Sequence, residues 1–388
     1  MKVLWINQKA SLQGGAEQYI FNTVEEMKNF DVQSSLIYDA NEIATNEFLD
    51  VFEEAFPMVD VYEQILSINP DVIYIHQLDD HETYEHILET RIPTVRFFHD
   101  HKLFCLREHK YTTIGKRTCT KKLGLGCYGC LGFVNRSNTA LGFSINTLGK
   151  LEKLQALNRR LHHFIVASDY MREHLTLHEF EDEKITVNPL YASKKFSYST
   201  QTNFTKNKTL LFVGQLINGK GLDALLKSMK KIPEEYNLIV VGEGKQEEYF
   251  KHYTKELNIT HRVEFVGKAS HEELMQYYEK AYCLVVPSRA PETFNLVGIE
   301  AQRVGLPVIA TDVGGVSQWL KDDVNGLLVT PNDIKDLQRK ITQLIEDKSM
   351  HQRICFNVLK SNIYAHDSRA HASLLVDTFK KHVGVRHV

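Results

Sequence analysis

Two glutamates, Glu292 and Glu300, lie eight residues apart in the segment 282–315, YCLVVPSRAPETFNLVGIEAQRVGLPVIATDVGG. The apolar runs 284–286 and 308–310 are typical of parallel strands covered on both faces, so Glu292 falls in a loop and Glu300 in the helix that follows. Open α/β sheets bind their ligands at the carboxyl ends of strands, beside helix N-termini. Carboxylates there are expected to bind the hydroxyl groups of a ligand or a cation.

A pair of glutamates could also be the acid and nucleophile of a glycoside hydrolase. A helix N-terminus favours ionised carboxylates, however, whereas a general acid must stay protonated near neutral pH. We therefore expect Glu292 and Glu300 to hold a ligand rather than to act as an acid/base pair.

A glycine turn follows the first predicted strand, 3–6. Gly14 and Gly15 lie between this strand and a helix predicted from Ala16 to Lys28. Glycine lets backbone amides approach a phosphate at the start of a helix. An ordinary tight turn would have the same glycine pair.

Two more glycine turns follow strands in the second half of the chain. In GQLINGKG, Lys220 lies between glycines just before a predicted helix, where its charge can meet a phosphate. The next strand opens into Gly242-Glu243-Gly244.

Two histidines end neighbouring predicted strands. His76 follows strand 72–75 and His99 follows strand 94–98, so in one parallel sheet both would emerge at the edge that carries Gly14. The run HQLDDHETYEH also suggests metal ligands, although it lacks a compact spacing such as H-E-x-x-H. These candidate ligands are His76, Asp79, Asp80 and His81.

The loop 101–130 holds four of the six cysteines, Cys105, Cys119, Cys127 and Cys130. One C-x-x-C with two further cysteines fits a structural zinc site or an iron–sulfur cluster. Buried thiols without a ligand are the alternative, because a second C-x-x-C is missing.

The part of this loop from 101 to 122 is strongly basic. Positive charge there suggests peripheral contact with an anionic membrane or with a phosphorylated acceptor, and solvated charge is the alternative. The basic residues are Lys102, Arg107, Lys110, Lys116, Arg117, Lys121 and Lys122.

Length and composition indicate a soluble globular protein of two domains. The chain has 388 residues, 43% hydrophobic and 24% charged, and its net charge of −3 argues against a nucleic-acid binder. No apolar run approaches the length of a membrane span, and the polar N-terminus lacks the features of a signal peptide, which indicates the cytoplasm. Repeated strand–helix units in both halves predict two doubly wound parallel sheets.

The predicted domain boundaries follow changes in pattern. Residues 1–191 form an N-terminal domain that includes the cysteine-rich loop, and the polar segment 192–208 is the linker. Residues 209–365 form a C-terminal domain. The segment 366–388 contains a helix with an apolar face that is expected to pack back on the N-terminal domain.

Together the motifs resemble the family 4 retaining glycosyltransferases of the GT-B fold over nearly the whole chain. The matching stretches are QGGAEQYI, DVIYIHQ, TVRFFHD, VGQLINGKG, VVGEG, VEFVGKAS, VVPSRAPETFNLVGIEA and GLPVIATDVGG. Glu292 and Glu300 have the spacing of the family's E-x7-E motif. The resemblance implies two Rossmann-like domains facing across a cleft. The C-terminal domain would bind a nucleotide-diphosphate sugar, and the N-terminal domain would bind an acceptor.

The resemblance also implies roles for single residues. Glu300 would bind the ribose hydroxyls and Glu292 those of the donor sugar, while Lys220 would pair with the diphosphate. His99 aligns with a histidine near the reacting carbon, so His99, Glu292 and Lys220 form the implied catalytic set.

Further donor-binding positions are backbone groups. Glycines would let the backbone approach the donor, and amides at the start of the helix after Glu292 would support the diphosphate or the sugar. These residues are Gly14, Gly15, Gly242, Gly244, Phe294, Asn295 and Leu296.

The implied reaction is a metal-independent hexosyl transfer with retention of anomeric configuration. A nucleoside diphosphate leaves well once lysine and helix dipoles match its charge, so no strong protein acid is needed. The resemblance suggests a glycan or lipid-linked acceptor in cell-surface polysaccharide biosynthesis, on the inner face of the membrane. A sugar-nucleotide epimerase and a non-catalytic nucleotide-sugar-binding partner are the alternatives.

Three positions depart from the family pattern. Gln215 stands where an arginine is usual, and it lacks the charge and fork that suit a diphosphate. Asn295 replaces a usual glycine and Gln318 a usual glutamate. The first two suggest an altered donor preference or slower turnover.

Overall fold

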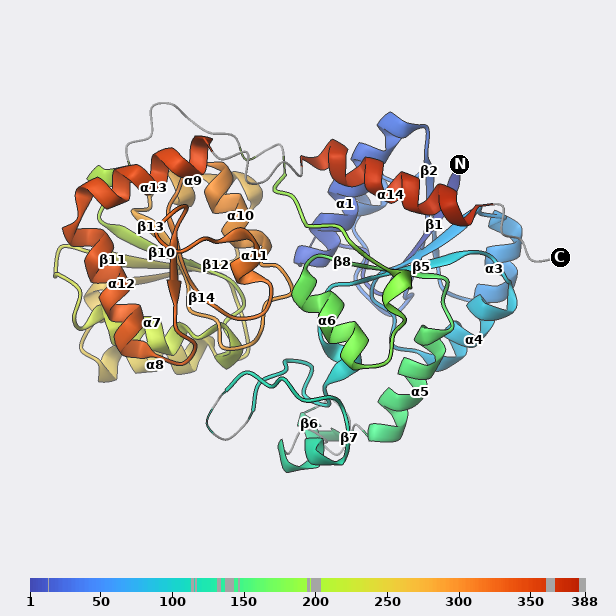
Figure 1. The fold of residues 1–388 in the computed structure, drawn as a ribbon, viewed down its shortest axis with the longest axis horizontal. Helices are drawn as coiled ribbons and strands as arrows, with labels where there is room; N and C mark the ends of the chain where they lie inside the picture. The colour runs from blue at the N-terminus through green and yellow to red at the C-terminus, as the bar shows by residue number, and fades with distance from the viewer. Residues whose placement is uncertain are drawn as a thin grey trace. The chain divides into compact units, whose positions relative to one another are not determined.

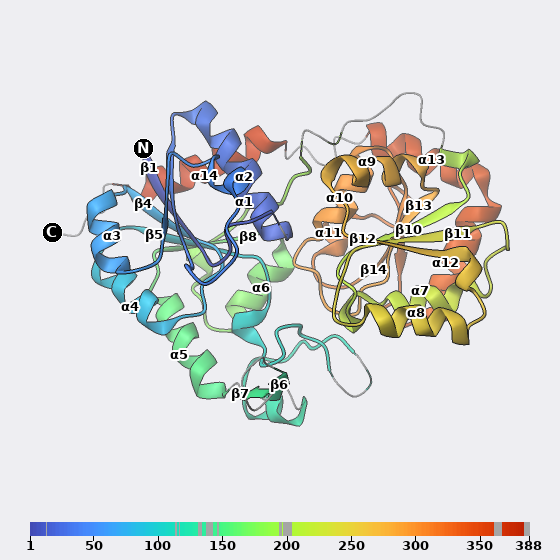
Figure 2. The same cartoon turned by 180° about the vertical axis from the view of Figure 1, so that it is seen from behind.

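The structure is a computed structural model. It describes residues 1–12, 14–112, 115, 117–130, 134–136, 143–145, 147–193, 196, 204–360 and 367–383. These residues form two compact units (Figures 1 and 2). Unit 1 holds the described parts of Met1–His109, Lys121–Leu190 and His366–Val388, and unit 2 those of Lys110–Thr120 and Tyr191–Ala365.

Unit 1 is built on a seven-stranded parallel sheet in the order β3-β2-β1-β4-β5-β8-β9. The strands are β1 (Lys2–Asn7), β2 (Gln33–Tyr38), β3 (Glu54–Pro57), β4 (Val72–Ile75), β5 (Thr94–Phe98), β8 (His163–Val166) and β9 (Ile185–Val187). Its helices are α1 (Gly15–Met27), α2 (Asn46–Leu49), α3 (Val61–Ile68), α4 (His81–Glu89), α5 (Leu148–Arg159), α6 (Asp169–Leu177) and α14 (Ser368–His382). A separate antiparallel pair joins β6 (Val134–Arg136) and β7 (Phe143–Ile145).

Side chains of the central strands alternate between two buried faces of this sheet. Leu4 and Ile6 pack with apolar residues of α3, α4, α5 and α6, whereas Trp5 and Tyr74 lie on the other face. Helices α1 and α14 cover that other face (Figure 1). The period of two in a strand therefore directs neighbouring residues of β1 to opposite faces, both of them buried.

The C-terminal helix α14 packs on α1 within unit 1. His371 and Tyr19 share a hydrogen bond of 2.8 Å, and Ser368 donates one of 2.7 Å to Glu26. Phe379 lies against Tyr74 with ring centroids 5.0 Å apart. The last helix thus completes the aromatic face of the first sheet.

Unit 2 is built on a six-stranded sheet in the order β12-β11-β10-β13-β14-β15, again entirely parallel. The strands are β10 (Thr209–Val213), β11 (Asn237–Val241), β12 (Val263–Gly267), β13 (Cys283–Val286), β14 (Val308–Thr311) and β15 (Leu327–Val329). Its helices are α7 (Leu222–Met229), α8 (Glu247–Glu256), α9 (His271–Lys280), α10 (Leu296–Arg303), α11 (Val316–Trp319), α12 (Ile334–Glu346) and α13 (Lys348–Lys360).

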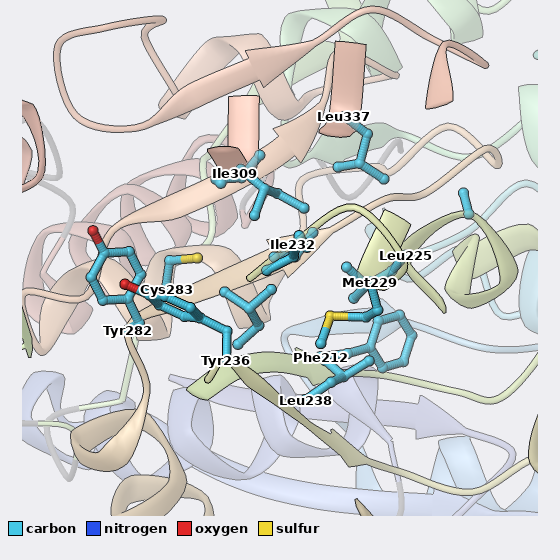
Figure 3. Close-up of a cluster of buried hydrophobic side chains, with 14 of the residues drawn as sticks. Phe212, Leu225, Met229, Ile232, Tyr236, Leu238, Tyr282, Cys283, Ile309 and Leu337 are labelled. Atoms are coloured by element: carbon cyan, nitrogen blue, oxygen red, sulfur yellow. The ribbon is translucent and has the colours of Figure 1, made fainter. Parts of the chain in front are cut away.

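Helices cover both faces of this second sheet. Helices α7, α8 and α12 lie on one face, and α9 and α10 on the other (Figures 1 and 2). Figure 3 shows part of this core, with Phe212, Leu238 and Ile309 of the sheet, Leu225 and Met229 of α7, and Leu337 of α12. The two parallel sheets with helices on both faces confirm the predicted α/β fold class.

The unit boundaries differ in one respect from the predicted domains. The prediction placed all of loop 101–130 with the first domain, whereas Lys110–Thr120 is grouped with unit 2. Much of the predicted linker 192–208 lies outside the described residues. Among the described helices, none has the length and apolarity needed to cross a membrane.

Candidate functional site

A lysine and a glutamate meet at the carboxyl end of β13. Lys220 Nζ lies 2.8 Å from Oε1 and 3.0 Å from Oε2 of Glu292, and the Ser288 hydroxyl donates to Oε1 at 2.5 Å. Lys220 ends the short 3₁₀ helix Asn218–Lys220 before α7, while Glu292 lies in the loop before α10. A glycine-flanked lysine and a loop glutamate that are far apart in the sequence are therefore joined by one ion pair.

This ion pair keeps Glu292 charged despite its burial. Burial raises the pKa of Glu292, but the Lys220 charge and hydrogen bonds from Lys220, Ser288 and Asn295 outweigh it, so the pKa lies below its ordinary value. The expectation of an ionised carboxylate is met at this position. An ionised Glu292 can accept hydrogen bonds from sugar hydroxyls but cannot act as an acid.

The backbone of Glu292 is held by the turn after β14. The Gly315 amide donates to the Glu292 carbonyl at 2.7 Å. A Cβ added at Gly314, whose φ is +63°, would lie 2.1 Å from that same carbonyl oxygen. Glycine at 314 is therefore required for the close approach that fixes Glu292.

Asn295 explains why a glycine is usual at its position. Its φ is +80°, in the left-handed region that glycine adopts freely and asparagine tolerates best among the others. Its side chain also accepts a hydrogen bond of 2.8 Å from the Gly298 amide and so caps α10. Asparagine therefore fits this backbone shape and supplies a helix cap at the same position.

Glu300 lies inside α10 and has a different environment. It is 6% exposed, and the Tyr278 hydroxyl donates to its Oε2 at 3.3 Å. Burial raises the pKa of Glu300 to about 8, against a smaller lowering by the Tyr278 hydrogen bond. The expectation that the helix N-terminus would keep both glutamates ionised is therefore wrong for Glu300, which lies in the second turn without a counter-ion.

The two glycine loops after β10 and β11 pack directly against each other. A Cβ at Gly242 would lie 2.1 Å from the Gly214 carbonyl oxygen. The Leu216 amide donates to the Glu243 carbonyl at 2.9 Å. Gln215 is exposed beside them. These loops lie at the same edge of the sheet as Glu292, as expected for parallel strands.

Sequence reasoning missed an arginine that braces the Lys220 loop. Arg289 forms a two-pronged ion pair with Asp223, at 2.5 and 2.8 Å, and also donates to the Asn218 carbonyl. Its own amide donates to the Gly219 carbonyl at 2.8 Å. The bidentate geometry of an arginine fork suits this bracing role. Its place next to Ser288 in the PSRAPE stretch was the available signal.

In unit 1, Gly14 precedes α1 with an extended backbone at φ −145°. A Cβ added there would lie 2.5 Å from Oε2 of Glu17, a buried carboxylate. Burial raises the pKa of Glu17, although Lys9 and Asn7 partly offset this rise. Gly14 thus makes room for a carboxylate that the sequence reading did not identify.

His99 and His76 lie at the ends of β5 and β4, which are neighbours in the sheet. His76 Nδ1 and His99 Nε2 are 2.8 Å apart. Burial lowers the pKa of His99 to about 3, with a further contribution from Arg96, and lowers that of His76 well below its usual value. Both rings are therefore neutral, and the shared sheet edge expected for them is confirmed.

The four cysteines of the loop do not form a metal site. Cys119 belongs to the part of the loop grouped with unit 2, while Cys105, Cys127 and Cys130 belong to unit 1, and none of these four described residues forms a disulfide. Across the described part of the chain, no group of three or more His, Cys, Asp or Glu side chains could hold a metal ion. Within unit 1, Cys105, Cys127 and Cys130 therefore do not form such a group.

The same finding overturns the metal reading of HQLDDHETYEH. Asp80 caps α4, accepting from the Thr83 amide at 2.7 Å, and His81 Nε2 contacts the Lys150 carbonyl at 3.0 Å. Asp79 lies 3.9 Å from Lys102. These polar residues are explained by capping and pairing.

Comparison with protein families identifies the C-terminal half. Residues 194–358 match the family model described as glycosyl transferases group 1. The chain is 30% identical over 187 residues to an uncharacterized glycosyltransferase of Methanocaldococcus jannaschii, covering 46% of this chain and 47% of that protein. It is 36% identical over 146 residues to the D-inositol 3-phosphate glycosyltransferase of Mycolicibacterium smegmatis, covering 37% and 33%. The chain thus spans less than half the length of these relatives.

Solved structures match nearly the whole fold. The Anabaena protein HepE superposes with a TM-score of 0.73 at 18% identity, covering 98% of this chain and 100% of HepE. Sucrose-phosphate synthase from Thermosynechococcus elongatus superposes with a TM-score of 0.71 at 20% identity, and the match covers 98% of each chain. At such identities the likeness shows the fold alone, and the chain has the GT-B fold. Its residues 194–358 resemble the glycosyl transferases group 1, in agreement with the motifs of that segment.

Proposed function

We propose that this protein is a retaining glycosyltransferase that moves a sugar from a uridine-diphosphate sugar to a hydroxyl of a glycan or lipid-linked acceptor. The observation that carries the proposal is the cluster of Lys220, Ser288 and Glu292 at the carboxyl end of β13, beside the start of α10. It combines a cation for a diphosphate with an ionised carboxylate for sugar hydroxyls.

Structural neighbours support the donor class. HepE is described in complexes with UDP and with UDP-glucose. A variant of TarM from S. aureus, with a TM-score of 0.72 at 11% identity, is described with UDP, fondaparinux and α-GlcNAc-glycerol. The uridine nucleotide and a glycan acceptor are carried to this chain as part of the proposal.

The proposed donor site uses each group of unit 2 in one role. An ammonium has three N–H groups, and two contacts of Lys220 go to Glu292, so its third proton can bind the diphosphate while the pair stays intact. Amides of Phe294, Asn295 and Leu296 supplement this charge at the start of α10. Gly214, Gly242 and Gly244 bring backbone close to the donor, with Gln215 beside them.

Glu300 is proposed to bind the ribose. Its carboxyl group is neutral before the donor arrives, because burial raises its pKa to about 8. A neutral carboxyl group can donate to one ribose hydroxyl oxygen and accept a hydrogen bond from the other hydroxyl. Tyr278 holds it from the other side.

The chemistry proposed at the reacting carbon needs no protein acid. Lys220 and the α10 amides stabilise the charge that builds on the departing diphosphate. The acceptor hydroxyl attacks from the same face, gives its proton to the leaving phosphate and so retains the configuration. Glu292 holds the donor sugar, and His99 together with Gly14 and Gly15 belongs to the proposed acceptor side.

Metal independence, membrane contact and the biological setting are further parts of the proposal. Metal independence predicts unchanged turnover with excess EDTA, because the protein supplies the charge for the diphosphate. Peripheral membrane contact is proposed for the basic loop, although Lys110 is only 1% exposed and Lys122 pairs with Glu179. Lys116 lies outside the described residues. Cell-surface polysaccharide biosynthesis is the proposed setting.

The decisive experiment measures UDP release from UDP-sugars with and without added acceptor glycans. Release that depends on the acceptor supports transfer. An epimerase would interconvert nucleotide sugars without acceptor, and a non-catalytic partner would bind UDP without releasing it from a donor. Gln215 is the residue that favours this last alternative, so Gln215→Arg should raise turnover if the glutamine merely slows an active enzyme.

A further inference from the structure

His99 contacts a second histidine, His76, that has no role in the proposed reaction. His76 is 1% exposed, and its Nδ1 lies 2.8 Å from Nε2 of His99. The two rings are nearly stacked, with centroids 5.1 Å apart and planes 30° apart. A hydrogen bond at this distance requires one of the two nitrogens to carry a proton and the other to accept it.

The surroundings of His76 decide which nitrogen carries the proton. Its other nitrogen, Nε2, is buried and has no hydrogen-bond partner among the described residues. A buried N–H without an acceptor is rarer in proteins than a buried lone pair without a donor. The proton of neutral His76 therefore belongs on Nδ1, from which it is donated to His99.

The His76 ring is also held in place by aromatic contacts. Trp5 stacks on it with planes only 2° apart and centroids 5.1 Å apart, and Tyr74 meets it edge-on at 4.4 Å. The Trp5 indole N–H is itself satisfied by Ser34 at 3.1 Å. The donor to His99 is thus fixed in direction by packing on the α1 and α14 face of the sheet.

We propose that His76 is a positioning residue that locks His99 in one neutral tautomer, with the proton of His99 on Nδ1. Nε2 of His99 accepts from His76, so a neutral His99 can carry its own proton only on Nδ1. A neutral His99 then cannot act as a base through Nε2. The inference rests on the proposed role of His99 in sugar transfer, but the tautomer itself does not.

Two isosteric substitutions separate this role from simple packing. In His76→Asn the amide nitrogen can occupy the place of Nδ1, whereas in His76→Gln it reaches toward the place of Nε2. We expect His76→Asn to keep the lock and His76→Gln to lose it. His76→Phe, which fills the space without any donor, is a second variant that should behave like His76→Gln.

The primary readout is nitrogen NMR of the full chain labelled with ¹⁵N-histidine, with His99 assigned by the signals lost in His99→Gln. Wild type and His76→Asn should show His99 protonated on Nδ1, and His76→Gln and His76→Phe should show a shift toward Nε2 protonation. A His99 protonated on Nε2 in wild type, or the same tautomer in all variants, would overturn the proposal.

Turnover of UDP-glucose provides the functional readout. His76→Gln should lower kcat about tenfold with little change in KM, and His76→Asn should restore most of it, since the loss concerns orientation at the reacting centre. If the tautomer shifts in His76→Gln but its kcat equals that of His76→Asn, the result would contradict a positioning role. If no UDP-sugar is turned over at all, the proposed function fails, while the NMR result still decides the tautomer.

Discussion

The two units bury their polar side chains in opposite ways. In unit 2, Glu292 is kept ionised by Lys220. In unit 1, His76 and His99 are kept neutral among Trp5 and Tyr19. Burial alone favours the neutral form in all of these groups, so the presence of a counter-ion decides the charge. A lysine thus keeps a buried carboxylate charged in the unit proposed to bind the donor, whereas the two buried imidazoles of the other unit stay neutral.

The contrast also holds within unit 2, between Glu292 and Glu300. Both side chains are buried. Glu292 pairs with a lysine and its pKa is below the ordinary value, whereas Glu300 contacts a tyrosine and its pKa is well above the ordinary value. Glutamates of opposite charge state usually suggest an acid and a nucleophile. Here the neutral one is buried against Tyr278 inside a helix, which favours ligand binding.

Removing the charge of Glu292 should have the largest effect. Glu292→Gln keeps the size and loses the ionised acceptor, so we expect UDP release to fall about 10²–10³-fold. The exposed Glu272 on α9 gives a matched control, and Glu272→Gln should change the rate less than twofold. Equal rates for wild type and Glu292→Gln would refute the site assignment.

Removing Lys220 tests the other half of the pair. Lys220→Met should weaken UDP binding at least tenfold, as measured by calorimetry. Because it leaves Glu292 buried without a counter-ion, it should also lower the free energy of unfolding by about 3 kcal/mol. Adding Glu292→Gln to this variant should restore much of the stability without restoring binding. A double variant as unstable as Lys220→Met would mean that the lysine acts through packing.

Glu300 should make unit 2 less stable as the pH rises. Its pKa is about 8 in the fold and near 4.5 when unfolded, so the fold binds the extra proton and loses stability from about pH 4.5 up through pH 8. With Trp5→Phe, the remaining tryptophan, Trp319, reports on unit 2. In that background Glu300→Gln should raise the melting temperature by several degrees at pH 8 relative to pH 5. An equal effect at both pH values would contradict the assigned charge state.

His99 should make unit 1 less stable as the pH falls, which is the opposite of the effect of Glu300, and the change should be smaller. Its pKa of about 3 lies below the unfolded value of 6.5, so stability is present above pH 6.5 and is lost as the pH falls toward 3. With Trp319→Phe, Trp5 reports on unit 1. There His99→Gln should reduce the loss of stability between pH 7 and pH 5 by a few degrees of melting temperature, partly offset by the broken bond to His76. A steeper loss in the variant would show that His99 is charged in the fold.

The sequence allowed the strands and the loop position of Glu292 to be predicted, because buried parallel strands have a clear apolar pattern and their carboxyl ends share an edge. The charge of Glu300 could not be predicted, since it depends on Tyr278, which is distant in sequence and approaches only in the fold. The positive φ of Asn295 was visible only as a departure from a family glycine. The common edge of His76 and His99 followed from strand order, but their hydrogen bond required coordinates.

The hairpin Lys110–Thr120 limits how this protein can be cut or recombined. It is grouped with unit 2, where Tyr111 lies 3.1 Å from a Cβ placed at Gly219 and the Thr118 hydroxyl donates to the Arg289 carbonyl at 3.2 Å. A fragment that starts at Tyr191 would lack this hairpin and would expose the backbone next to Lys220. The C-terminal half is therefore not a portable module, and a chimera with a relative would have to exchange residues 110–120 together with it.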